Sequence, residues 1–226
     1  MNVLCIATSN HGKLEELRLL LADLPVEIVS MEQALAHPPV VVEDGKTFED
    51  NSVKKACQIA AATMMLTVAD DSGLEVDALD GAPGVRSARY ASERATDAEN
   101  NAALLSALDA LAESSVDGHD LTREHAFRAR FRCVLAVVDP YSNNGEPRTV
   151  EGTCEGAITR MPRGSGGFGY DPLFLVEGTN KTMAELTAAE KNAVSHRARA
   201  CLALKPVLEE LLSNRARTID AIARTP

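Results

Sequence analysis

Apolar residues recur in short runs and in helical spacings along the first half of the chain. Residues 2–7 form an apolar run, and in residues 11–24 leucines follow at intervals of three and four, the period of a helix buried on one face. Asn10 and Thr47 stand where a polar side chain can cap the helix that follows. The predicted strands cover residues 2–7, 26–29, 64–69 and 74–76, and the predicted helices cover residues 11–24, 47–64 and 97–111.

The second half of the chain changes to the period of a half-exposed strand. In residues 127–133 polar and apolar residues alternate, and this run can pair with residues 149–158 through a turn at residues 141–147. The polar and acidic residues 114–122 precede this change and form the best candidate for a linker. The resulting order predicts a mixed α/β fold with a late antiparallel hairpin, in which two lobes can surround one cleft.

The end of the chain is predicted to be helical. A glycine-rich loop at residues 163–169 leads into a short strand at residues 173–176. The pattern Thr-Ala-Ala-Glu is that of a capping box, and it opens one long final helix predicted over residues 187–212. Pro206 should kink this helix, and we expect the tail from about Asn214 to fray.

Composition argues against several classes of protein. The 226 residues carry a net charge of −10, which argues against a surface that coats nucleic acid, although a small anionic substrate needs only a local positive pocket. No apolar run is long enough to span a bilayer, and the first residues lack the basic start of a signal peptide. We therefore expect a cytoplasmic protein without membrane or nucleic-acid partners. The five scattered cysteines include no Cys-x-x-Cys pair, which predicts reduced thiols rather than a zinc site or a disulfide frame.

Two adjacent carboxylates, Asp70 and Asp71, follow a predicted buried strand. Buried carboxylates are costly unless a metal, a cation or a reacting water uses them. Ser72 and Gly73 are expected to turn the chain sharply, which would place the acids at the edge of a cleft. The same four residues also suit a surface turn, so this segment alone leaves both interpretations open.

Residues 8–13 read Thr-Ser-Asn-His-Gly-Lys and join the first strand to the first helix. Hydroxyl groups, a carboxamide, the free N–H groups of a helix start and Lys13 converge within one turn, which suits a bound phosphate. The spacing is not that of a Walker A loop. The alternative is an ordinary helix cap with a solvated lysine.

Residues 164–169 formally match the G-x-G-x-x-G pattern of dinucleotide-binding folds. That motif requires a helix after the loop, whereas residues 170–175 read as turn and strand, so we reject a dinucleotide site. A glycine-rich loop that carries Phe168 still suggests close approach of the backbone to a ligand, with a ring on which a base can stack. A flexible hairpin loop is the alternative.

A polar cluster is predicted near the start of the final helix. It consists of Lys191, Ser195, His196 and Arg197. Because Lys191 and Ser195 are four residues apart, they should share one face of a continuous helix, with His196 and Arg197 further round. A solvated helix face is the alternative for this cluster.

Taken together, six ordered motifs resemble the inosine/xanthosine triphosphate pyrophosphatase family, the Ham1-like non-canonical purine nucleotide pyrophosphatases. The resemblance covers nearly the whole chain, from about Val3 to Leu212, and the order of the motifs makes it specific where each alone is weak. The motifs are Thr8-Ser9-Asn10-x-x-Lys13, Thr47-Phe48-x-x-Asn51, Ala69-Asp70-Asp71-Ser72-Gly73-Leu74, Gly81-Ala82-Pro83-Gly84 with Ser87-Ala88-Arg89-Tyr90, Gly166-Gly167-Phe168-Gly169-Tyr170-Asp171-Pro172 and Ser195-His196-Arg197.

The resemblance implies a fold and an activity. The fold is a single α/β domain over residues 1–226 with an elongated mixed sheet flanked by helices and a cleft between two lobes, usually as a homodimer. The activity is Mg²⁺-dependent hydrolysis of ITP, dITP and XTP to the monophosphate and pyrophosphate, which cleanses nucleotide pools.

The resemblance also assigns roles to residues. Asp71 would be the catalytic carboxylate and a metal ligand, with Glu43 as the second ligand. The residues that would contact the substrate are Thr8, Ser9, Asn10, His11, Gly12, Lys13 and Lys55 at the phosphates, and Ser72, Phe168, Gly169, Tyr170, Asp171, Lys191, His196 and Arg197 at the nucleotide. The resemblance is imperfect near Glu43, where some relatives carry two acids, so Asp44 and Asp70 remain alternative metal ligands.

Two other functions are compatible with these residues. A Maf-like nucleotide pyrophosphatase would cleave the same bond in substrates with another modified base. A non-catalytic nucleotide-binding module would hold the nucleotide without turnover. A substrate panel distinguishes the two enzymes, and turnover distinguishes both of them from the binding module.

Overall fold

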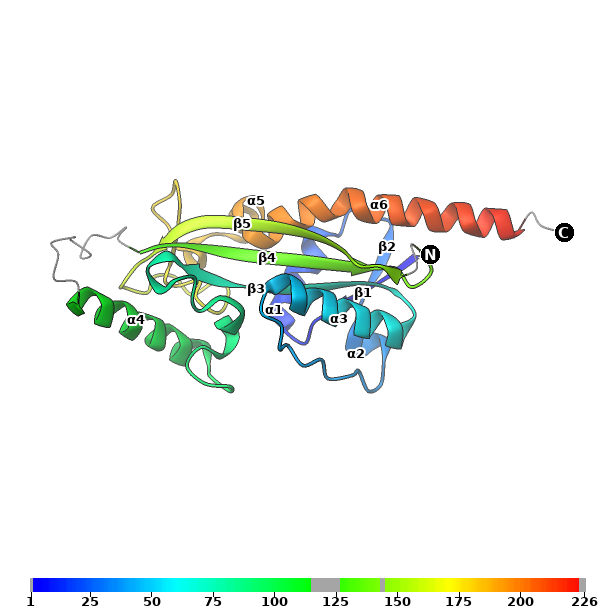
Figure 1. Cartoon of the computed structure of the whole chain (residues 1–226). Helices are drawn as coiled ribbons and strands as arrows, with labels where there is room; N and C mark the ends of the chain where they lie inside the picture. The colour runs from blue at the N-terminus through cyan, green and yellow to red at the C-terminus, as the bar shows by residue number, and fades with distance from the viewer. Residues whose placement is uncertain (1, 115–126, 143–144, 224–226) are drawn as a thin grey trace. The chain divides into compact units, whose positions relative to one another are not determined.

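A computed structural model of the chain describes residues 2–114, 127–142 and 145–223 (Figure 1). Residues 115–122 of the expected linker lie outside these ranges. The helices and strands are β1 (Asn2–Ala7), α1 (His11–Leu20), β2 (Val26–Ser30), α2 (Met31–Ala34), α3 (Phe48–Thr63), β3 (Leu66–Val76), α4 (Asp97–Ser114), β4 (Arg128–Val138), β5 (Arg148–Ile158), β6 (Phe174–Val176), α5 (Ala188–Val194) and α6 (His196–Ala223), with 3₁₀ turns at Asp77–Leu79, Gly84–Arg89 and Met183–Glu185.

The described strands form one mixed sheet in the order β2-β1-β3-β4-β5-β6 (Figure 1). β1 is parallel to both β2 and β3, whereas β5 and β6 are antiparallel. In the β1–β3 register Ile6 lies opposite Val68 and Ala7 opposite Ala69. The expected mixed α/β fold, with an open sheet flanked by helices, is therefore confirmed, and the register brings the end of β1 beside the acidic pair of β3.

The chain forms two compact units. Unit 1 takes the described residues of Met1–Asp71, Val134–Gly152 and Arg199–Pro226, and unit 2 takes those of Ser72–Cys133 and Thr153–Ala198. The boundaries fall inside β3, β4, β5 and α6, so each of these elements contributes residues to both units. The predicted cleft between two lobes stays a prediction.

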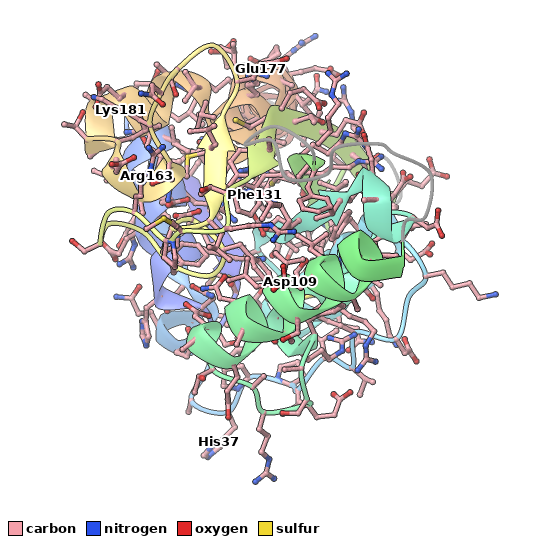
Figure 2. The ribbon with its side chains drawn as sticks, turned by 90° about the vertical axis from the view of Figure 1, so that its left-hand side faces the viewer. His37, Asp109, Phe131, Arg163, Glu177 and Lys181 are labelled. Carbon is pink, nitrogen blue, oxygen red and sulfur yellow. The ribbon has the colours of Figure 1, made fainter. Side chains whose placement is uncertain are left out.

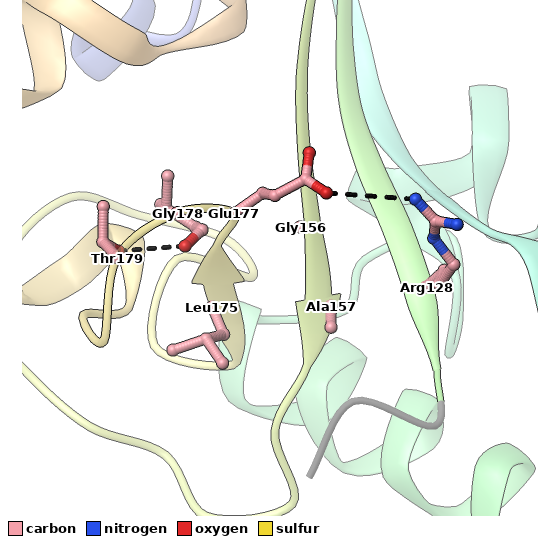
Figure 3. Close-up of a pocket in the computed structure, with 8 residues that line it drawn as sticks. Arg128, Gly156, Ala157, Leu175, Glu177, Gly178 and Thr179 are labelled. Atoms are coloured by element: carbon pink, nitrogen blue, oxygen red, sulfur yellow. Dashed lines mark hydrogen bonds and ion pairs between the residues drawn. The ribbon is translucent and has the colours of Figure 1, made fainter.

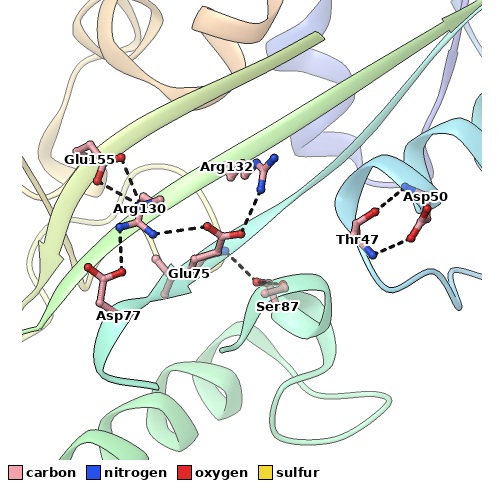
Figure 4. A network of polar contacts seen from close by, with 10 residues as sticks. Thr47, Asp50, Glu75, Asp77, Ser87, Arg130, Arg132 and Glu155 are labelled. Carbon is pink, nitrogen blue, oxygen red and sulfur yellow. Dashed lines mark hydrogen bonds and ion pairs between the residues drawn. The ribbon is translucent and has the colours of Figure 1, made fainter. Parts of the chain in front are cut away.

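Unit 1 has a core of small and branched apolar side chains from β1, α3, β3 and β4. α3 begins behind a capping box in which the Thr47 hydroxyl accepts from the Asp50 N–H (3.0 Å) and the Asp50 carboxylate accepts from the Thr47 N–H (3.1 Å) (Figure 4). On its buried face Asn51, Lys55 and Ile59 follow at intervals of four. The helical period therefore turns two polar side chains inward together with the apolar ones.

Unit 2 has a core that contains several rings. Phe131 of β4 packs against Phe174 with ring centroids 4.5 Å apart, and it lies inside the unit, while Asp109 and Lys181 lie at its surface (Figure 2). The opposite face of β4 is polar, as the alternation predicted. There Arg130 pairs with Asp77 at 2.9 Å and bridges to acids on β3 and β5 (Figure 4).

The expected sharp turn after the acidic pair is wrong. β3 runs without interruption through Asp70, Asp71 and Ser72 as far as Val76. Gly73 is needed for close packing instead, because a Cβ there would lie 2.3 Å from the Ser87 Oγ. The Ser87 hydroxyl accepts a hydrogen bond from the Leu74 N–H at 2.9 Å, so the loop takes the place that a side chain on the strand would fill.

The predicted single final helix is divided in two at Ser195. This residue has an extended conformation (ψ 153°), and its hydroxyl accepts a hydrogen bond from the Ala198 N–H at 3.2 Å, which caps α6. Lys191 and Ser195 are therefore not on one face of a continuous helix. α6 then runs for 28 residues to Ala223, where we had expected fraying from about Asn214. Among the described residues, no helix combines the length and apolarity needed to cross a membrane.

A buried ion pair holds α6 in place just beyond Asn214, where fraying was predicted to begin. Arg215 donates two hydrogen bonds to Asp139, from Nε to Oδ2 (2.7 Å) and from Nη2 to Oδ1 (2.6 Å). The Asp139 side chain is almost completely buried. Burial alone would raise the pKa of Asp139, but the hydrogen bonds from Arg215 and from the Tyr141 N–H outweigh it and lower this pKa.

We expect Arg215→Met to lower the free energy of unfolding at neutral pH by about 3 kcal/mol, because the substitution leaves the Asp139 carboxylate buried without its cation. Because the folded pKa of Asp139 is lowered, the stabilisation is present above the unfolded pKa of about 3.9 and is lost as the pH falls through the folded pKa. Urea denaturation at neutral and acid pH measures both effects. Arg217→Met, on the exposed side of the same helix, is the matched control. Equal losses in the two variants at neutral pH would contradict this assignment.

Candidate active site

The segment after β1 places Lys13 beside the acidic pair Asp70 and Asp71. The Asn10 side chain caps α1 by accepting from the Lys13 N–H at 3.0 Å, and the Thr8 hydroxyl accepts from the Asn10 N–H at 3.2 Å. The Lys13 Nζ then lies 2.6 Å from the Asp70 carboxylate, which has no exposed surface. The alternative of a solvated lysine beside an ordinary cap is therefore wrong, since this lysine balances a buried charge.

A second lysine reaches the same strand from α3. The Lys55 Nζ is 2.5 Å from a Glu43 carboxylate oxygen and donates a hydrogen bond to the Asp70 carbonyl oxygen at 3.0 Å. Lys13 and Lys55 thus approach Asp70 through its side chain and its main chain respectively. Two cations therefore converge on one residue of β3, in a chain whose net charge is negative.

Asp71 is the acid of this group whose pKa is raised toward neutrality. Its carboxylate accepts a hydrogen bond from the Asn51 Nδ2 at 3.1 Å, and only 6% of the residue is exposed. Burial raises the pKa of Asp71 to about 6, against the opposing charges of Lys13 and Lys55, and the charge of Glu43 adds to the rise. A carboxylate with this pKa can take up a proton at physiological pH.

The surroundings of the neighbouring acids differ. Asp44 is two-thirds exposed and pairs with Lys54 at 2.5 Å, and Asp70 is held by Lys13. Glu43 is the acid whose charge reaches Asp71. Among the described residues, no three His, Cys, Asp or Glu side chains form a ready ligand set. This donor set fits a cation that takes one or two carboxylates and keeps its waters, as Mg²⁺ does, rather than one that needs a protein cage.

In unit 2 an arginine is buried against the first residue after Asp71. The Arg197 Nη2 donates to the Ser72 hydroxyl at 2.9 Å, and Arg197 is only 1% exposed. His196 is also buried and stacks on the Phe131 ring, with centroids 4.9 Å apart. The alternative of a solvated helix face is therefore wrong for His196 and Arg197.

The glycine-rich loop is anchored by a buried carboxylate. The Asp171 Oδ2 accepts from the Phe168 N–H at 3.2 Å and pairs with the Lys191 Nζ at 2.9 Å. A Cβ at Gly167 would lie 1.9 Å from that same oxygen, so only glycine leaves room for it. The Phe168 ring has Lys191 Nζ 5.3 Å and Arg197 Cζ 5.8 Å from its centroid, within the range of cation–π contact. The loop is thus held in a defined shape.

The predicted substrate-contacting residues fall into two groups. In unit 1, Ser9, Asn10 and His11 are exposed and Gly12 lies in the first turn of α1, beside the paired lysines. In unit 2, Tyr170 is buried and its hydroxyl donates to the Ser87 carbonyl oxygen at 2.9 Å. The first group comprises Thr8 to Lys13, Glu43, Lys55 and Asp71, and the second comprises Ser72, Phe168 to Asp171, Lys191, His196 and Arg197. Only Asp71 and Ser72 are neighbours in the sequence, in β3, where unit 1 ends and unit 2 begins.

Sequence reasoning missed the role of Asn51. The residue is 1% exposed, and while its Nδ2 holds Asp71, its Oδ1 accepts from the Gly45 N–H at 2.8 Å. It thereby connects the acid to the loop that carries Glu43. The spacing of four between Asn51 and Lys55 was the signal that places both on one helix face.

A surface pocket of about 230 Å³ lies elsewhere in unit 2, along β5 and β6 (Figure 3). It is lined by Arg128 and by residues 156–157 and 175–179, none of which belongs to either group above. The charged side chains in this lining, Arg128 and Glu177, face each other at 3.9 Å. The pocket thus offers no chemistry that resembles that around Asp71.

Comparison with known proteins finds similar chains along nearly the whole length. Residues 4–207 match the Ham1 family. A dITP/XTP pyrophosphatase of Geobacter sulfurreducens is 49% identical over 205 residues, which cover 91% of this chain and 96% of that protein.

Solved structures agree with this match. A HAM1 protein from Coxiella burnetii is 40% identical, with a TM-score of 0.79, and the match covers 93% of this chain and all of that one. A nucleoside-triphosphatase, or dITP/XTP pyrophosphatase, from Mycobacterium abscessus is 43% identical, with a TM-score of 0.67, and the match covers 90% of this chain and 99% of that one.

The raised pKa of Asp71 makes its charge a cost to folding, so we expect Asp71→Asn to stabilise the metal-free protein. The folded pKa of about 6 lies above the unfolded value, so the stability of the parent falls as the pH rises from about 4 to 6 and then levels off. At pH 7.5 the variant should gain up to about 2–3 kcal/mol, and below about pH 4 the gain should vanish.

Chemical denaturation in the presence of a chelator measures this pH dependence in the parent and in Asp71→Asn. Asp44→Asn is the matched control, because its exposed carboxylate has a lowered pKa through its pair with Lys54 and should show no such gain. A variant less stable than the parent at pH 7.5 would show that the Asp71 charge is favourable in the folded chain.

Proposed function

The chain belongs to the Ham1 family, and we propose that it is a nucleoside triphosphate pyrophosphatase that hydrolyses dITP, ITP and XTP to the monophosphate and pyrophosphate. The observation that carries this proposal is Asp71, a buried carboxylate with a pKa of about 6 beside two paired lysines. Similar proteins that bear the name dITP/XTP pyrophosphatase support the choice of substrate. This hydrolysis would remove non-canonical purine triphosphates from the nucleotide pool.

We assign the triphosphate to the group in unit 1. Lys13 and Lys55 can neutralise part of the roughly four negative charges of a triphosphate, and the N–H groups at the start of α1 can donate to its oxygens. The exposed positions of Ser9, Asn10 and His11 leave this helix start open to a ligand. Each lysine would then exchange its present carboxylate or carbonyl partner, at least in part, for a phosphate oxygen.

We assign Mg²⁺ to Asp71 and Glu43. Glu43 is preferred because its charge acts on Asp71. Asp44 is the weaker candidate because its side chain is two-thirds exposed and points to Lys54, and Asp70 is weaker because its side chain has no exposed surface. When bound, Mg²⁺ supplies positive charge to the phosphate oxygens and orders waters around itself.

We assign the role of general base to Asp71. A pKa of about 6 leaves the carboxylate mostly ionised at neutral pH yet basic enough to accept a proton from an attacking water. The hydrogen bond from Asn51 fixes the position of the Asp71 carboxylate. The water would attack the α-phosphorus, and the lysines would stabilise the departing pyrophosphate.

We assign the purine to the group in unit 2. Phe168 offers a ring for stacking, and Lys191, His196 and Arg197 carry donors that suit the 6-oxo group shared by hypoxanthine and xanthine. Adenine presents a donor at that position, so a site built from donors would reject it. Guanine shares the 6-oxo group and must be excluded at its 2-amino group.

The alternatives are less well supported. The match to the Ham1 family along residues 4–207 favours this family over a Maf-like enzyme. A non-catalytic binding module has no need of a buried carboxylate with a pKa near neutrality, and turnover tests this point. A homodimer in the cytoplasm stays a prediction from the resemblance.

Incubation with ITP and Mg²⁺ should release the monophosphate and pyrophosphate, and Asp71→Asn should lower kcat by at least about 10²-fold, the size of a general-base contribution. The variant that is expected to gain stability should thus lose activity, which excludes unfolding as the cause. Products can be identified by phosphorus-31 NMR. Orthophosphate and the diphosphate as first products would reject this mechanism, and a near-normal kcat in Asp71→Asn would reject Asp71 as the base.

Lys55→Ala should lower kcat/KM by about 10- to 100-fold for every purine alike, because a lost charge-assisted bond to phosphate carries no information about the base. Lys54→Ala is the matched control, since its partner is the exposed Asp44. The measurement is kcat/KM for ITP, XTP, GTP and ATP at one Mg²⁺ concentration. In the parent we expect ITP and XTP well above GTP, with ATP lowest. A loss confined to one base would contradict the assignment of Lys55, and equal rates on ATP and ITP would contradict base recognition.

A further inference from the structure

Two side chains of helix α4 form hydrogen bonds with the backbone N–H and carbonyl groups of Gly169, in the glycine-rich loop. The Asp97 Oδ2 accepts a hydrogen bond from the Gly169 N–H at 2.7 Å, and the Asn101 Nδ2 donates one to the Gly169 carbonyl oxygen at 3.0 Å. Asp97 and Asn101 are four residues apart, so both project from one face of α4. We call these two side chains the α4 clamp.

Gly169 separates a buried anchor from the ring of the loop. On one side Tyr170 is buried and bonded to Ser87, and on the other Phe168 is only partly buried. Gly169 has a positive φ of 62°, which favours glycine, and a Cβ there would meet no atom within 4 Å. The orientation of the Gly169 backbone therefore contributes to the direction of the Phe168 ring, beside the contacts of that ring with Lys191 and Arg197, and no side chain at position 169 helps to fix it.

We propose that Asp97 and Asn101 are positioning residues for base recognition, which hold the Gly169 backbone and through it the Phe168 ring. The inference rests on the proposed function, in which the purine stacks on Phe168. The other end of Phe168 is held by Asp171, whose carboxylate accepts its N–H. With the α4 clamp, the backbone is therefore tied on both sides of the ring before a nucleotide arrives, and less ordering is needed on binding.

Asn101 is a poor choice for folding alone, which favours a functional reason for it. Its Oδ1 is buried and has no hydrogen-bond partner among the described residues, and such an acceptor lowers stability. Asparagine is also a weaker helix former than leucine, which has a similar shape. Asn101→Leu should therefore leave the melting temperature nearly unchanged, because the removal of the unpaired Oδ1 and the better helix propensity of leucine offset the lost bond to the Gly169 carbonyl oxygen. A residue that served stability alone could not respond in this way.

The first experiment follows the ring without any substrate. The chain has no tryptophan, so Phe168→Trp introduces a single tryptophan, whose fluorescence can be excited separately from that of the three tyrosines. In that background we expect Asn101→Leu to raise the acrylamide quenching constant by about twofold, because a released loop exposes the ring more often. An unchanged quenching constant would overturn the proposal whether or not ITP is a substrate.

The second experiment measures steady-state kinetics on ITP with the natural Phe168. Asn101→Leu should raise KM by about tenfold, within the range of one base–aromatic stack, and leave kcat within about twofold, because the α4 clamp acts on base binding rather than on the attacking water. Phe168→Ala is the reference variant. If Phe168→Ala raises KM and Asn101→Leu does not, the α4 clamp has no positioning role and the proposal is rejected.

Two further variants separate positioning from helix stability. Asp97→Asn keeps an acceptor for the Gly169 N–H and should retain the parent KM, whereas Asp97→Ala should raise it. Glu99→Ala breaks the bonds that Glu99 makes with Thr96 at the start of α4 and touches no atom of Gly169, so it should lower the melting temperature without changing KM. If Glu99→Ala raises KM as much as Asp97→Ala does, the rise in KM comes from a less stable α4 and not from the contact with Gly169, and the proposal is rejected. A KM unchanged in Phe168→Ala would instead contradict the stacking role in the proposed function.

Discussion

The burial of two consecutive carboxylates in one strand is the constraint on which the rest of unit 1 depends. A strand turns successive side chains to opposite faces, so Asp70 and Asp71 need different partners. Asp70 is neutralised by Lys13, while Asp71 receives one hydrogen bond from Asn51 and is left with a raised pKa. The strand thus contains one acid whose charge is balanced by a lysine and one whose pKa is raised toward neutrality.

Three segments that are distant in sequence supply these partners, and each does so through an ordinary element of secondary structure. The cap of α1 positions Lys13, the helical period of α3 places Asn51 and Lys55 on one face, and the loop before α3 brings Glu43 to Lys55. Parallel pairing of β1 with β3 puts the first segment beside the acids. Asp71 and its partner Asn51 therefore lie on a strand and a helix, while the exposed residues 9–11 lie at the start of α1.

In unit 2, hydrogen bonds between side chains and main-chain atoms hold the glycine-rich loop in place. Ser87 connects β3, through the Leu74 N–H, with the loop residue Tyr170, and α4 holds Gly169. Polar side chains that bond to main-chain atoms fix the path of a glycine-rich segment that has few side chains to pack. This explains how a loop with several positive-φ glycines can present one ring in a defined place.

The sequence alone determined most strands and helices, the capped start of α3 and which acids and lysines are candidates for the site, because these follow from local periodicity and from motifs of adjacent residues. It did not predict α2, the continuity of β3 or the division between α5 and α6. Tertiary structure decided what those residues do. β3 passes straight through Asp70 to Gly73 because a loop some fourteen residues later fills the place of a side chain at Gly73. Likewise, the contact of Arg197 with Ser72 and that of Asn51 with Asp71 join residues that are distant in the sequence. Local pattern specifies which chemical groups are present, but their pKa and burial depend on neighbours that only the folded chain supplies.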